Sequence, residues 1–163
     1  MNPFKAIKAW FAFPEYRDSV AALVAYLPVG DLDSLVMWRE KWIPYKSDKG
    51  DGGGLDNYNG ADLTIKAKGG DCESIAAVYS EVIRQWKNWE SWHVCFVFTR
   101  TEGKTYEAHD VAVFIDPKGR QGWIGGDIHY GNYEDFKNYY NDIGWKIVDW
   151  FVVNDIGQKV SKL

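Results

Sequence analysis

Cysteine is scarce in this chain, which has two, Cys72 and Cys95, among 163 residues. Two thiols are too few for the disulfide framework of a small secreted domain, so we expect a reducing compartment, the cytoplasm. Long apolar runs are missing too, because the longest, residues 20–29, is about half of what a bilayer crossing needs and contains Pro28. The N-terminal stretch is broken at Pro14 without a small-residue cleavage site after it, so we expect neither a signal peptide nor a membrane partner.

An excess of positive charge is also absent. The chain has 19 Lys and Arg against 23 Asp and Glu, a net charge of −4 at pH 7, and no basic stripe, which disfavours a nucleic-acid partner. Aromatic residues, by contrast, are abundant, with 9 Trp, 10 Tyr and 8 Phe. Most of these rings suit half-buried strands, and a groove for a glycan or a peptide is the alternative.

The apolar pattern mixes helical and strand periods. It predicts helices over 15–27, from Asp31 or Asp33 to Trp42, over 72–86 and over 133–140, and strands over 92–99, 105–115 and 145–153. Residues 45–60 form a polar, glycine-rich loop that borders the segment before Cys72. This loop lacks the preceding strand and the following Lys-Ser/Thr of a phosphate-binding loop.

Cys72 is predicted to be a nucleophile at the start of a helix. It follows Gly69-Gly70-Asp71 and precedes an apolar-periodic run. Asp71 is a favoured N-cap, and the positive end of the helix stabilises a thiolate, so we expect the pKa of Cys72 to lie below about 8.5. The glycines let the backbone approach a substrate closely. Cys95, in the middle of an apolar strand, is predicted to be an inert core thiol.

A turn at residues 116–120 sets a strand register. If Asp116 and Arg120 close a three-residue hairpin loop, counting back along both strands pairs His109 with Asp127. Asp116 itself lies on the order of 23 Å from His109 along the strand, too far for contact. A slip of one residue would put Asp110 opposite Asp127 instead. The candidate catalytic residues are therefore Cys72 as nucleophile, His109 as base and Asp127 as the orienting carboxylate.

These segments resemble the transglutaminase-like cysteine peptidase superfamily, especially its bacterial branch, within the papain-like group. Residues 42–48, 56–58 and 68–73 are similar to the region that leads into the cysteine of that family, 107–109 to its histidine segment and 122–127 to its aspartate strand. The resemblance implies an α+β, papain-like domain over 1–163, with an N-terminal helical part (1–44) and a catalytic core (68–154). In it, a nucleophile helix packs on an antiparallel β-sheet.

The chemistry that the resemblance implies is acyl transfer at a peptide or carboxamide bond of a protein or peptide substrate, without a cofactor. Water would resolve the thioester in a protease or amidase, and a lysine amine would do so in a transglutaminase. Backbone N–H groups at the helix start would bind the oxyanion, with the Trp42 side chain as a candidate second donor.

Two other classes of function stay open. His93 with Cys95, and Asp127 with His129, are pairs two residues apart, which point to one face of a strand and would converge with Cys72 or His109 on zinc. Without such a site, His93 and His129 are structural or surface residues. The other class is a non-catalytic binding module that uses the fold, with its aromatic surface or glycine-rich loop, to bind a partner.

Overall fold

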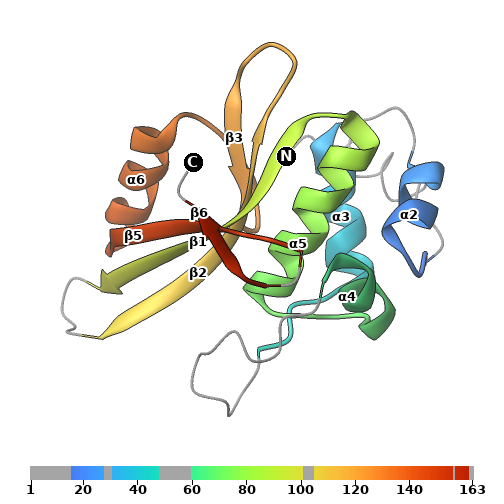
Figure 1. Ribbon diagram of the computed structural model, residues 1–163, viewed down its shortest axis with the longest axis horizontal. Coiled ribbons are helices and arrows are strands. Elements are labelled where there is room, and N and C mark those ends of the chain that lie inside the picture. Colours follow the sequence, from blue (N-terminus) through green and yellow to red (C-terminus); the bar gives the residue numbers. More distant parts are fainter. Residues whose placement is uncertain (1–15, 28–30, 48–59, 101–104, 156, 162–163) are drawn as a thin grey trace.

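The computed structural model describes residues 16–27, 31–47, 60–100, 105–155 and 157–161 (Figure 1). Most of the glycine-rich loop predicted at 45–60 lies outside the described residues, and so does segment 56–58. Among the described residues, no helix has both the length and the apolar character to cross a membrane.

The described strands form one six-stranded sheet in which all neighbours are antiparallel, in the order β4-β3-β2-β1-β5-β6. This confirms the predicted α+β class with an antiparallel sheet. The strands are β1 (Glu90–Arg100), β2 (Tyr106–Ile115), β3 (Gln121–Ile124), β4 (Ile128–Tyr130), β5 (Trp145–Val153) and β6 (Lys159–Ser161).

The helices lie on both faces of the sheet (Figure 1). Helix α5 (Cys72–Val82) packs on β1 and β2 and continues into a π-helical turn, η2 (Ile83–Lys87). Around α5, on its side of the sheet, lie α2 (Val20–Tyr26), α3 (Leu32–Trp42) and α4 (Ala61–Ala67). Helix α6 (Tyr133–Asp142) lies on the other face, against β5. Its N-cap is Asn132, which forms a capping box with Asp135.

Each face of the sheet has its own apolar core. Successive side chains of a strand point to opposite faces, so Ala112 and Phe114 of β2 join the core under α2–α5, whereas Val111 joins the core under α6. By the same alternation, Asp110 faces α5 and His109 faces α6. Two adjacent residues of β2 therefore reach different sides of the molecule.

The hairpin between β2 and β3 has the predicted loop. The Asp116 backbone N–H donates to the Arg120 carbonyl at 3.0 Å, and Gly119 has a positive φ of 77°. The pairs run from Ile115 with Gln121 to Ala112 with Ile124, which confirms the predicted register. Burial raises the pKa of Asp116, but hydrogen bonds from Arg120 and from the Lys118 backbone outweigh this and the net pKa is lowered. Asp116 therefore holds the turn.

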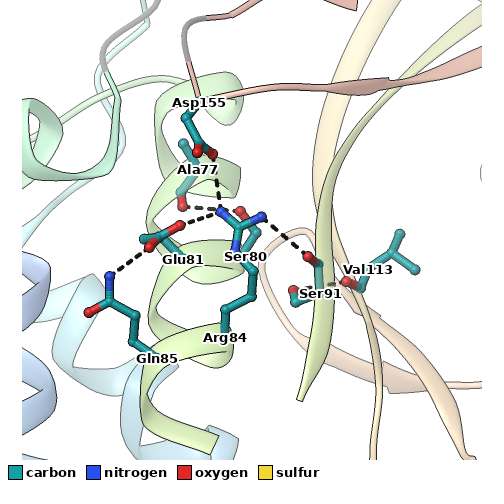
Figure 2. A network of polar contacts seen from close by, with 8 residues as sticks. All are labelled: Ala77, Ser80, Glu81, Arg84, Gln85, Ser91, Val113 and Asp155. Carbon is teal, nitrogen blue, oxygen red and sulfur yellow. Dashed lines mark hydrogen bonds and ion pairs between the residues drawn. The ribbon is translucent and has the colours of Figure 1, made fainter. Parts of the chain in front are cut away.

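Arg84 ties the end of the helical segment to the sheet (Figure 2). Its guanidinium pairs with Glu81 on α5 and donates to Asp155, after β5, at 3.1 Å and to the Ser91 carbonyl, on β1, at 3.5 Å. Ser91 in turn donates its hydroxyl to the Val113 carbonyl of β2 at 2.9 Å. One side chain thus connects α5, β1 and the segment after β5.

Candidate active site

Cys72 is the first residue of α5, as the sequence predicts. The Asp71 side chain is the N-cap and accepts from the Ser74 backbone N–H at 3.1 Å. Gly70 is required here by close packing, because a Cβ at this position would stand 2.5 Å from the Ser74 Cβ and 3.2 Å from the Thr64 methyl group. Cys72 is partly exposed, while its helix is otherwise mostly buried.

The thiol of Cys72 is not acidified by the helix. Burial raises its pKa to about 11, and the charge of Asp110 contributes further, with a smaller contribution from Asp71. Hydrogen bonds to the sulfur from the backbones of Asp110 and Glu73 lower the pKa, but by less than the opposing effects raise it. The predicted lowered pKa is therefore wrong, because desolvation and two nearby carboxylates outweigh the helix terminus. At neutral pH, Cys72 carries its proton.

His109 lies on β2, one residue before the N–H that contacts the Cys72 sulfur. Its ring packs against Tyr140 of α6 and Trp145 of β5, with centroid distances of 5.9 and 5.6 Å. Burial lowers the pKa of His109, and the charge of Asp110 offsets part of this effect. The imidazole is therefore neutral at pH 7 and can accept a proton.

Gly125, in the bend after β3, lies where His109 and Tyr140 meet. A Cβ at Gly125 would stand 3.3 Å from the Nε2 of His109 and 3.1 Å from the Tyr140 hydroxyl. A charge on Cys72 would raise the pKa of Tyr140, which places the sulfur within electrostatic range of the same group. The Tyr140 hydroxyl thus lies close to the imidazole of His109 and within electrostatic range of the Cys72 sulfur, although Cys72 and His109, both described, share no hydrogen bond.

The predicted cross-strand pair of His109 with Asp127 is not formed. Pairing between β2 and β3 ends at Ile124, because residues 125–127 form the bend that leads into β4. Asp127 is exposed in this bend; burial lowers the pKa of His129, and the Asp127 charge offsets part of that effect. The charge that acts on His109 comes from Asp110 instead. The register was right, but the strand is too short to carry Asp127 to His109.

Asp110 was missed as a central residue of the site. Its carboxylate lies 2.8 Å from the Nε2 of His93, and both side chains are buried. It is paired across the strands with Cys95, whose pKa is raised by burial and then by the Asp110 charge. The signal in the sequence was the adjacency of Asp110 to His109, together with the alternation that turns it toward α5.

The other candidate residues have structural surroundings. Cys95 is buried, in agreement with a core thiol, and His129 stacks on Trp123 with ring centroids 5.0 Å apart. Among the described residues, no three His, Cys, Asp or Glu side chains are arranged to hold a metal ion, so the zinc alternative finds no site there. The indole N–H of Trp42 is buried without a hydrogen-bond partner in this part of the chain, as are those of Trp38 and Trp123.

Neither a protein-family model nor a curated protein matches the chain. The site has three features that bear on its chemistry. A protonated thiol stands at a helix start, a neutral imidazole lies on β2, and a buried carboxylate, the adjacent Asp110, acts on both. The rings around His109 leave no space for a water molecule on the α6 side. Substrate access to its imidazole therefore has to come from the edge of β2.

Proposed function

We propose that this protein is a cysteine-dependent acyl-transfer enzyme of the transglutaminase-like, papain-like kind, acting as a protease or amidase on a protein or peptide. Cys72 is the nucleophile and His109 the base. The observation that carries the proposal is the position of the Cys72 sulfur. Cys72 starts a helix that packs on the two central strands, β1 and β2. Its sulfur accepts from the backbone N–H of Asp110, the residue that directly follows His109.

The protonation states set the order of events. Because Cys72 is protonated and His109 neutral at rest, the imidazole takes the thiol proton as the sulfur attacks the carbonyl carbon. The carbon–nitrogen bond then breaks, the amine leaves with the proton from the imidazolium, and a thioester remains on Cys72. Water, deprotonated by His109, hydrolyses the thioester. Backbone N–H groups at the start of α5 stabilise the oxyanion, with Trp42 as the candidate second donor.

Asp110 takes the electrostatic role that the sequence assigned to Asp127. Its charge raises the pKa of His109, which means that it stabilises the imidazolium formed during the attack. The rings of Tyr140 and Trp145 hold the imidazole in place by packing. Asp110 therefore acts on His109 through its charge, while its carboxylate hydrogen-bonds to His93.

A second candidate function is favoured by two observations. The raised pKa of Cys72 and the missing hydrogen bond between Cys72 and His109 are both expected of a binding module that has kept the fold without catalysis. The two candidates differ in one chemical property, which is whether His109 assists the reaction of the thiol with an acyl donor.

Acylation by p-nitrophenyl acetate tests this directly, with release of p-nitrophenol followed over pH and the adduct located by intact-mass and peptide mass spectrometry. With His109 as base, the acylation rate of Cys72 reaches a plateau by about pH 7, because the imidazole is deprotonated above its lowered pKa. Without a base, the rate follows the thiolate and rises about tenfold per pH unit up to the thiol pKa of about 11.

We expect His109→Ala to remove the plateau and to slow acylation at neutral pH by about a hundredfold. Cys95→Ala is the matched control and should change nothing, because that thiol is buried. A wild-type protein that shows only the tenfold-per-unit rise, unchanged by His109→Ala, would refute the enzyme and support the binding module.

A further inference from the structure

A pocket lies on the α6 face of the sheet, away from Cys72. It has a volume of about 290 Å³, and its walls are mostly aromatic rings from three strands and α6: Trp92, Phe96, Trp123, Tyr133, Phe136 and Trp150. Tyr133 is 42% exposed, and its ring lies 6.1 Å from that of Trp150. We call this the aromatic pocket. Its size is at the lower end of ligand pockets and suits one ring-bearing group better than an extended chain.

The chemistry of the walls restricts the ligand. Among the described residues that line the aromatic pocket, none is charged. An anionic group placed there would lose its hydration without a partner, which is strongly unfavourable. The occupant is therefore not anionic, and its surface is largely apolar.

A sugar fits less well than an aromatic side chain. Each buried hydroxyl needs a hydrogen-bond partner, and leaving one unbonded costs about 1–3 kcal/mol. Besides the indole N–H groups and the Tyr133 hydroxyl, Gln121 and Asn132 are the polar side chains that line the pocket within the described chain, and the side-chain carbonyl of Asn132 already accepts from the backbone N–H groups of Glu134 and Asp135. Flat rings, in contrast, pack well against a wall of other rings.

The aromatic pocket shares part of its wall with the surroundings of His109. Phe96 and Phe136, whose rings stack at 4.1 Å, form part of its wall and also line the tightly packed space that contains His109. A peptide whose side chain fills the pocket would therefore lie on the same face of the sheet as His109, beside its ring. We infer that the aromatic pocket selects an aromatic or large aliphatic side chain of the peptide substrate, an assignment that rests on the proposed function.

Binding to the Cys72→Ala variant tests the pocket independently of catalysis. N-acetyl-phenylalanine amide, N-acetyl-alanine amide and methyl glucoside are titrated separately, with binding followed by ligand-observed NMR. We expect the phenylalanine amide to bind and the other two not to. Trp150→Ala removes one wall and should weaken the binding about fivefold or more. Trp86→Ala, which removes a half-buried indole on η2 across the sheet, should leave the binding within about twofold.

Trp92→Leu is the second wall variant and should weaken binding in the same way, so the test stands if Trp150→Ala does not fold. Binding of methyl glucoside alone, equal binding of the two amides, no binding at all, or the same loss in Trp86→Ala would each overturn the inference. Acylation of Cys72 without any aromatic binding would refute the pocket and keep the enzyme. Aromatic binding to a protein that never forms an acyl adduct would refute the enzyme and keep the pocket as a peptide-binding site.

Discussion

At the scale of single residues, one buried carboxylate sets the electrostatics of the candidate site. Asp110 hydrogen-bonds to His93, and its charge raises the pKa values of Cys72, Cys95 and His109. For the two thiols, this favours the neutral form, while for the imidazole it favours the charged form. The same carboxylate thus adds to the effect of burial that keeps the resting nucleophile protonated, and it stabilises the protonated base.

We expect Asp110→Asn to lower the pKa of Cys72, because it removes a negative charge and retains an oxygen that accepts from His93. In a Cys95→Ala background, the ultraviolet absorbance of the thiolate should titrate at a lower pH than the value of about 11 in the parent. Each unit by which the pKa falls increases alkylation by iodoacetamide near pH 8 about tenfold.

Glu134→Gln is a suitable control for this change, since it removes a negative charge from an exposed side chain of α6. It should leave the Cys72 titration where it is. An unchanged titration in Asp110→Asn, or an equal shift in both variants, would show that the Asp110 charge does not act on the thiol.

At the scale of elements, the bend after β3 decides what surrounds His109. Gly125 and Gly126 are adjacent in this bend, and neither has a positive φ. Their environments differ, because a Cβ at Gly125 would meet the His109 imidazole, the Tyr140 hydroxyl and the Val111 side chain at 3.1–3.3 Å, whereas a Cβ at Gly126 would meet no atom within 4 Å.

Gly125→Ala should therefore destabilise the protein by about 1–3 kcal/mol through overpacking, as measured by urea unfolding. Gly126→Ala is the matched control, and we expect its free energy of unfolding to stay within about 1 kcal/mol of the parent, on the stabilising side. Both changes reduce the freedom of the unfolded chain equally, so the difference between them reports the contact alone. Equal unfolding midpoints would contradict the close packing around His109.

The comparison of sequence and structure is clearest for the same hairpin. Local chemistry at Asp116 and Gly119 was enough to predict the loop and the register, because the turn requires those residue types. Where β3 ends was not predictable, because β4 begins immediately after the bend and has only three residues. A strand this short has no periodicity of its own and forms by pairing with β3.

Helix α4 and strand β6 were missed for a related reason. They have seven and three residues, too few for a periodic pattern to separate them from loops. The longer elements were predicted well, and β5 begins and ends at the predicted residues. For Cys72, the position at the helix start was predictable from Asp71, but the direction of the pKa shift was not, because it depends on burial and on Asp110 from another strand.

At the scale of the whole molecule, a single sheet separates two cores, and the proposed chemistry takes place beside the part of β2 that β3 does not pair with. The core under α2–α5 contains the helix of Cys72, and the core under α6 contains the rings that hold His109. The relative position of nucleophile and base therefore depends on how firmly α5 is fixed to the sheet. At the end of α5, where η2 begins, this attachment includes the polar contacts of Arg84 (Figure 2).

Arg84→Lys should destabilise the protein by about 1 kcal/mol, because one ammonium group does not span Glu81, Asp155 and the Ser91 carbonyl as the guanidinium fork does. Thermal unfolding measures this loss. Arg100→Lys is the matched control, because Arg100 is 58% exposed and pairs with Glu107 on the neighbouring strand, and its loss should stay below about 0.5 kcal/mol. If the two variants unfold alike, the Arg84 contacts do not fix α5, and the geometry between Cys72 and His109 is maintained by the apolar cores alone.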